Sequence, residues 1–166
     1  MKAIVIADNK WGVSKNGKSL INIPLERKTM LELVSGSVVV YDYRYVDELP
    51  GQQALIGCDN IIFTDNAEVK VKNAVLCKTL SEVEAEVKKR SGKEVYIVHG
   101  AKLYNFFYDQ IDAWHVTKID YTYNTDESIP DIDRDPRFKL VNDSDELYLH
   151  DMVYSFLEYE KIKEIP

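Results

Sequence analysis

The feature that most constrains the fold is a series of short apolar runs separated by helical patterns. Four runs are apolar on both faces, as central strands of a parallel sheet must be, and they cover residues 3–7, 38–41, 60–64 and 95–98. Helical patterns separate the first run from the second and the third from the fourth. Such alternation predicts βαβ units, so we expect an α/β protein built on a mostly parallel sheet.

Three helices are predicted from capping and spacing. Pro24 suits a first helical turn, and the residues after it that share one helical face are Glu26, Met30, Leu33 and Val34. A capping box at Ser81–Glu84 predicts a second helix, with an apolar stripe of Leu80, Val83 and Val87. A third, short helix is expected over residues 101–107, directly after Gly100.

The last third of the chain has a different pattern. Apolar and polar residues alternate over 114–120, 138–141 and 152–159, with no helical pattern between these runs. We interpret them as strands that add an antiparallel edge to the sheet. The segment 124–136 is rich in Asp and Pro and is expected to be a surface loop. No linker or repeat divides the chain, which predicts one domain over residues 1–166.

Composition excludes several classes of function. The chain has 166 residues, 45% of them hydrophobic, and its 21 basic and 28 acidic residues give a formal net charge of −7. That charge argues against binding to nucleic acid or to an anionic membrane, and it repels anionic small molecules unless a local positive site compensates. No apolar run approaches the roughly 20 residues of a membrane-spanning helix. We expect a monomeric cytoplasmic protein.

The two cysteines, Cys58 and Cys77, leave two interpretations open. A single disulfide is one; two reduced thiols is the one we favour, because nothing resembling a secretion signal precedes them. Three scattered histidines and two cysteines show no metal-ligand spacing, so we expect no metal.

Several segments together resemble the dihydrofolate reductase family. Residues 8–17, after an apolar strand, resemble the first loop of the bacterial enzymes, and residues 19–26 stand in register with the family's Leu-Pro-Trp-x-Ile-Pro-x-Asp/Glu. Further similar segments follow in order at 49–51, 60–64, 95–100, 116–120 and 154–161. The resemblance implies a mostly parallel eight-stranded sheet with an antiparallel C-terminal edge, flanked by about four helices. It also implies hydride transfer from NADPH to dihydrofolate or a related pterin.

Glu26 is the candidate catalytic residue. The resemblance implies a buried carboxylate on the first helix that hydrogen-bonds the pterin and favours protonation of its ring. Independently, Glu26 shares an apolar helical face, and burial raises a carboxyl pKa toward neutrality. The alternative is a first-turn glutamate that is favoured by the helix dipole and half in water. Thr117 resembles a threonine of the same hydrogen-bond network; the alternative is an ordinary strand threonine.

The resemblance assigns further contacts. The substrate-binding residues that it implies, besides Glu26, are Ile6, Ala7, Met30 and Thr117. The cofactor-binding residues that it implies are Val13, Arg44, Thr64, Lys78, Val98, His99, Gly100, Ala101, Lys102 and Leu103.

On the cofactor side the sequence departs from the family. Residues 41–44 read Tyr-Asp-Tyr-Arg where the family has Gly-Arg-Lys/His-Thr, so Asp42 has the wrong sign for a phosphate and only Arg44 can compensate. His99 replaces the first of two glycines that let backbone amides approach a pyrophosphate. We interpret it as a neutral structural histidine that crowds the site; a phosphate donor is the alternative. Asp65 beside Thr64 weakens the expected preference for NADPH over NADH, and Lys78 has a solvated lysine as its alternative.

The substrate side departs as well. Leu20 and Ile21 replace the family's proline and tryptophan, Met30 replaces a phenylalanine, and Arg27 stands where an apolar residue is usual. The arginine that binds the glutamate tail of folate is missing after residues 49–51. A charge-assisted hydrogen bond of roughly 1.5–3 kcal/mol is then lost, which weakens folate by about one to two powers of ten unless Arg27 or a lysine reaches in.

Three hypotheses follow. The first is a slow or divergent NADPH-dependent dihydrofolate reductase. The second is a binding protein on the same fold without turnover. The third is a reductase of another pterin or pyrimidine that has no glutamate tail.

Overall fold

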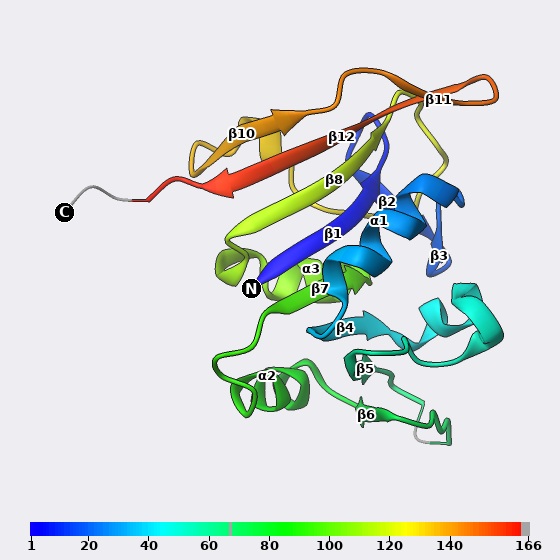
Figure 1. Ribbon diagram of the computed structural model, residues 1–166, viewed down its shortest axis with the longest axis vertical. Coiled ribbons are helices and arrows are strands. Elements are labelled where there is room, and N and C mark those ends of the chain that lie inside the picture. Colours follow the sequence, from blue (N-terminus) through cyan, green and yellow to red (C-terminus); the bar gives the residue numbers. More distant parts are fainter. Residues whose placement is uncertain (67, 164–166) are drawn as a thin grey trace.

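The computed structural model describes residues 1–66 and 68–163, and its centre is one large sheet (Figure 1). The strand order is β10-β12-β8-β1-β7-β4-β5-β6, with β11 paired to β12 at the C-terminal edge. The strands of this sheet are β1 (Lys2–Ala7), β4 (Val38–Asp42), β5 (Asp59–Phe63), β6 (Ala74–Cys77), β7 (Val95–His99), β8 (Ala113–Ile119), β10 (Phe138–Asp143), β11 (Leu147–Leu149) and β12 (Met152–Lys161). The six strands from β8 to β6 are parallel, whereas β12 is antiparallel to β8 and to β10.

Helices cover both faces of this sheet. The α-helices are α1 (Pro24–Val34), α2 (Leu80–Lys88) and α3 (Ala101–Phe106), and the 3-10 helices are η1 (Tyr43–Glu48), η2 (Pro50–Gln52), η3 (Tyr108–Gln110) and η4 (Ile132–Arg134). Within the described residues, α1, η1, α2 and α3 are the helical segments of six residues or more. The predicted fold, an eight-stranded path with an antiparallel C-terminal edge and about four helices, is confirmed.

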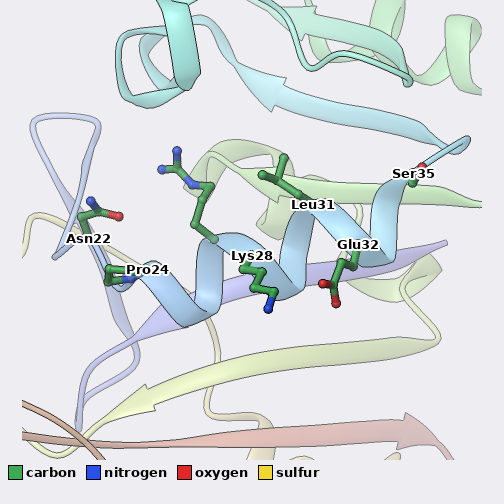
Figure 2. A pocket seen from close by; sticks show the side chains of 7 residues that line it. Asn22, Pro24, Lys28, Leu31, Glu32 and Ser35 are labelled. Carbon is green, nitrogen blue, oxygen red and sulfur yellow. The ribbon is translucent and has the colours of Figure 1, made fainter.

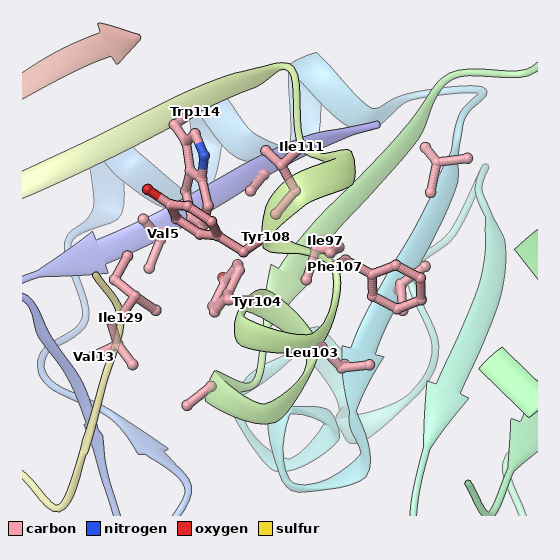
Figure 3. Close-up of a cluster of buried hydrophobic side chains, with 14 of the residues drawn as sticks. Val5, Val13, Ile97, Leu103, Tyr104, Phe107, Tyr108, Ile111, Trp114 and Ile129 are labelled. Carbon is pink, nitrogen blue, oxygen red and sulfur yellow. The ribbon is translucent and has the colours of Figure 1, made fainter. Parts of the chain in front are cut away.

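The core consists of two layers because the central strands are buried on both faces. On one face, Met30 and Val34 of α1 pack with Ile4 and Val39. On the other, side chains of β1 and β7 pack with α2 and α3, and Figure 3 shows Leu103, Tyr104 and Trp114 inside that layer. Burial of these apolar side chains supplies the main stabilisation, at roughly 25 cal/mol for each Å² removed from water.

The antiparallel edge begins one strand later than predicted. The run 114–120 corresponds to β8, which pairs in parallel with β1 along its whole length, with Ile4 opposite His115 and Ile6 opposite Thr117. The alternation of apolar and polar residues along β8 therefore does not mark an antiparallel edge strand. One face of β8 packs in the core through Trp114 and Val116, whereas the other face carries His115 and Thr117 and borders a cavity beside α1.

Two local predictions were also wrong. The cap of α2 is Thr79, whose hydroxyl accepts a hydrogen bond from the Glu82 amide, while the Glu82 carboxylate accepts one from the amide of Lys78. The same spacing of hydroxyl and acid thus occurs two residues before the predicted box. The surface loop 124–136 contains β9 (Glu127–Ser128), which joins β2 (Gly12–Lys15) and β3 (Lys18–Ser19) in a small second sheet.

Both cysteines are free thiols, as the favoured interpretation predicts. None of the helices in the described part of the chain is long and apolar enough to cross a membrane.

Candidate active site

The first turn of α1 places Glu26 on the side of the helix that faces the sheet. Pro24 begins the helix, and Glu26 shares the buried face with Met30 and Val34, as the spacing predicts. Only 8% of Glu26 is exposed, and its pKa is raised to about 7, mainly by this burial; Arg27 opposes the shift and the nearby Glu48 adds to it. Within the described residues no hydrogen bond reaches the Glu26 carboxyl group, so the group is free to bind a ligand.

Glu26 is shared by two chambers. The larger, which we call the open chamber, is a cavity of about 340 Å³ between α1 and the strands β8, β12 and β10. It brings together Glu26, Met30 and Thr117, three of the predicted site residues. Ile4, Leu33 and Phe156 supply apolar walls, and the cavity reaches the lower end of the volumes usual for small-molecule sites.

The second, which we call the closed chamber, lies on the other side of Glu26 and has a volume of only about 30 Å³. The predicted residues that line it are Ile6, Val13, Val98, His99, Gly100 and Ala101. That volume is close to the share of a single water molecule. The structure therefore gathers these predicted residues but leaves no room among them for a nicotinamide ring.

An aromatic pair closes this chamber. The ring of Tyr45, which is 4% exposed, stacks on the His99 imidazole at 4.6 Å between centroids and 14° between planes. Arg27 lies over the Tyr45 ring at 5.7 Å and donates a hydrogen bond of 2.8 Å to the carbonyl oxygen of Glu48. Sequence reasoning missed Tyr45, although it directly follows the divergent stretch 41–44, where an unexpected aromatic residue was the available signal.

His99 is neutral in these surroundings. Burial lowers the pKa of its imidazole, and the Glu48 carboxylate lies 3.7 Å from Nε2, near enough to oppose that shift in part. Neither ring nitrogen has a hydrogen-bond partner in the described part of the chain. The uncharged imidazole thus forms part of the lining of the closed chamber.

Arg44 is engaged within the chain. Its guanidinium group donates to both carboxylate oxygens of Asp42, at 3.0 and 3.1 Å, and Asp42 also accepts the backbone N–H of Arg44 and caps η1. The guanidinium rests on Gly17, where a Cβ would lie 2.3 Å from its central carbon. Asp42 thus satisfies the one basic group that was expected to compensate for it.

Gly100 has a local reason to be glycine. Its φ of +113° is a conformation that side chains rarely adopt, and a Cβ there would lie 3.2 Å from both Asp42 Cβ and Leu103 Cδ1. Packing around α3 accounts for this glycine without a bound phosphate.

Besides Arg44, five predicted site residues line neither chamber. Ala7 and Leu103 are buried in the core, and the hydroxyl of buried Thr64 accepts the backbone N–H of Asn66. Lys78 and Lys102 are exposed, the latter in a shallow depression between α3 and β9. Together with the closed chamber and the Arg44–Asp42 pair, these positions do not fit NADPH as the protein stands.

The outer face of α1 carries two basic residues, Arg27 and Lys28. A shallow groove there is lined by Asn22, Pro24, Arg27, Lys28, Leu31, Glu32 and Ser35, and Figure 2 shows Lys28 and Glu32 on successive turns of the helix. Arg27 lies over the Tyr45 ring and donates one hydrogen bond to the Glu48 carbonyl oxygen, whereas its buried Nε has no hydrogen-bond partner in the described residues. Lys28 is exposed and has the acidic Glu32 as a neighbour.

The chain is thus an α/β protein in which a buried carboxylate of the first helix lies beside two cavities on a mostly parallel sheet. The family model described as dihydrofolate reductase matches residues 1–161, and the chain belongs to the dihydrofolate reductase family. A similar solved structure is the dihydrofolate reductase from Enterococcus faecalis complexed with NADP(H) and RAB-propyl, with a TM-score of 0.77 and 17% identity over 98% of this chain and 96% of that one. At this identity the similarity shows the fold alone. No curated protein matches the chain.

Proposed function

We propose that this chain is a monomeric, single-domain, cytoplasmic reductase that binds a pterin through Glu26 and reduces 7,8-dihydrofolate slowly with NADPH. The observation that carries the proposal is the Glu26 carboxyl group, which is buried, unpaired within the described residues and open to a chamber with apolar walls. Membership of the dihydrofolate reductase family supports the same activity.

The chemistry proposed for Glu26 follows from its surroundings. With a pKa raised to about 7, the group holds a proton at neutrality in about half of the molecules. In its ionised form it accepts two parallel N–H bonds from the amidine edge of a flat heterocycle. Thr117, 3% exposed on β8, adds a hydroxyl to the same chamber, and Met30 supplies an adaptable wall for the ring.

Slow turnover is part of the proposal because the dinucleotide half of the site is filled. The Tyr45–His99 stack must separate before an aromatic ring can enter beside Glu26. We therefore derive no catalytic step from the cofactor and assign only the handling of the heterocycle and its proton to this chain.

Two other candidates each have an observation in their favour. A binding protein without turnover is favoured by the closed chamber and by the Arg44–Asp42 pair. A reductase of a pterin or pyrimidine without a glutamate tail is favoured by the absence of an arginine from residues 49–58.

One assay separates the three. Purified protein is mixed with NADPH and dihydrofolate, loss of the reduced nicotinamide absorbance is followed, and methotrexate serves as the inhibitor control. Methotrexate-sensitive oxidation supports the proposed activity. Absence of NADPH binding in a fluorescence titration supports the binding protein, and NADPH binding without turnover of dihydrofolate supports another substrate.

A further inference from the structure

The open chamber continues past Glu26 and Thr117 to a polar end. We call this end the far lobe and define it by His115, Asn142 and Glu158, which lie opposite one another on β8, β10 and β12. In the antiparallel pairing of β8 with β12, Thr117 lies opposite Phe156 and His115 lies opposite Glu158. Residues two apart on a strand share a face and are separated by about 6–7 Å. The far lobe therefore begins one such step along the sheet from Thr117.

Both ends of the open chamber present free hydrogen-bond acceptors. Glu26, more than nine-tenths buried, occupies one end, and partly exposed Glu158 occupies the other. Apolar side chains of Met30, Leu33 and Phe156 line the space between them. In the described part of the chain, no hydrogen bond or ion pair reaches either carboxylate. An apolar slot with an acceptor at each end fits an elongated ligand with a donor at each end.

The charge around the far lobe is negative. Burial is the largest influence on His115 and lowers the pKa of its imidazole, which is therefore neutral at physiological pH; Glu158 and Glu160 oppose this shift and Lys2 adds to it. Lys2 is paired with Glu94 at 3.0 Å, and Lys139 lies opposite Glu160 in the pairing of β10 with β12, so both nearby cations have an acidic neighbour. An anionic glutamate tail is disfavoured in such surroundings, whereas an ammonium group gains a charge-assisted hydrogen bond.

We infer that the far lobe binds an ammonium-bearing substituent of the heterocycle that Glu26 holds. The preferred ligand class is then a flat amino-heterocycle, a pterin or diaminopyrimidine, with a cationic side chain, and dihydrofolate with its anionic tail is a weaker ligand of the same site. The inference rests on the proposed ligand contact of Glu26 but is independent of NADPH and of turnover.

Three synthetic ligands test this inference without cofactor. They are 2,4-diaminopyrimidines that carry a propylammonium, a propyl or a propionate chain at the same ring position, and their Kd values are measured by isothermal titration calorimetry. The propylammonium ligand is expected to bind about tenfold more tightly than the propyl ligand, with the propionate ligand weakest. Because Glu158 is partly exposed to solvent, we expect this ratio of Kd values to lie near the lower end of what a charge-assisted hydrogen bond provides.

Matched variants locate the effect. Glu158→Gln keeps the shape of the side chain and is expected to abolish the preference for the ammonium chain. Glu160→Gln removes the same charge two residues further along β12, outside the chamber lining, and is expected to keep the preference. Glu26→Gln is expected to weaken all three ligands. A melting curve for each variant verifies that it is folded.

The outcomes are distinct. Equal affinity of wild type for the ammonium and propyl ligands, absence of binding by all three, or equal losses in Glu158→Gln and Glu160→Gln each overturn the inference. A preference for the propylammonium ligand without NADPH oxidation refutes the reductase activity but supports the proposed role of the far lobe. Turnover of dihydrofolate without chain discrimination refutes the far lobe alone.

Discussion

The two chambers that meet at Glu26 differ in where their polar groups find partners. In the open chamber the Glu26 carboxyl group has no partner within the described residues, although leaving such a group unpaired costs stability. In the closed chamber Tyr45 and His99 fill the space, and the nearby Arg44 is paired with Asp42. One half of the site thus leaves its acidic group without a partner in the described residues, whereas the other half binds its aromatic and basic groups to other parts of the chain.

His99 is the exception in the closed chamber. Its stacking on Tyr45 is favourable, but both ring nitrogens lack partners in the described part of the chain. This makes the imidazole the weakest point of the closure.

Glu26→Gln removes the acid from the open chamber and keeps its shape. We expect turnover of dihydrofolate to fall by about 100- to 10,000-fold, because a positioned acid or base contributes that much. Wild-type turnover is also expected to fall as the pH rises through the Glu26 pKa of about 7. Steady-state kinetics across pH measure both effects. Glu84→Gln on α2, on the opposite face of the sheet, is the control, and unchanged turnover in Glu26→Gln removes Glu26 from the mechanism.

The same variant tests whether the Glu26 carboxyl group is buried without a partner, because such a group makes the free energy of unfolding depend on pH. The pKa of this carboxyl rises from 4.5 in the unfolded chain to about 7 in the fold. Between these values the folded state binds more protons, so its free energy of unfolding falls as pH rises, by about 3 kcal/mol in total. Urea unfolding of wild type and Glu26→Gln at a series of pH values isolates this contribution. A difference between them that is constant with pH contradicts the buried, unpaired carboxyl group.

His99→Gly is designed to open the closed chamber. Without the imidazole, the stack with Tyr45 is lost and space appears beside Gly100. We expect NADPH to bind about tenfold more tightly, which corresponds to about 1.4 kcal/mol, in a fluorescence titration. His150→Gly, at an exposed turn, controls for the loss of a histidine. If both variants bind NADPH like wild type, the imidazole is not what closes the groove.

Asp42→Asn is expected to have the smallest effect. The amide can still cap η1, but it no longer neutralises Arg44, whose guanidinium is about half exposed. Because such pairs are worth at most about 1 kcal/mol, we expect the preference for NADPH over NADH to rise by about two- to fivefold, and to shrink at high salt. Asp47→Asn, an exposed acid on η1, is the matched control. An equal change of the NADPH preference in both variants would mean that the net charge of the protein, and not the Arg44–Asp42 pair, causes the effect.

Local pattern predicted much of the fold and one half of the site. The spacing of Glu26, Met30 and Val34 depends only on helical periodicity, and the structure places all three on the buried face of α1. Strands that are apolar on both faces indicated the parallel sheet, because both faces of such a sheet are covered by helices. The start of α2 was misplaced by two residues because two hydroxyl-and-acid pairs with cap spacing overlap at 79–84, and sequence alone does not rank them.

What the sequence by itself determined about this protein is therefore the α/β fold, the family and the placement of an acid on the buried face of its first helix. Only the tertiary structure decided that Tyr45 would stack on His99, and that the pairing of β8 with β12 would set Glu158 beside His115. The physical reason is that periodicity and capping act between residues a few positions apart. A cavity, by contrast, is the space left after distant segments pack, and its volume depends on side chains that no local pattern relates.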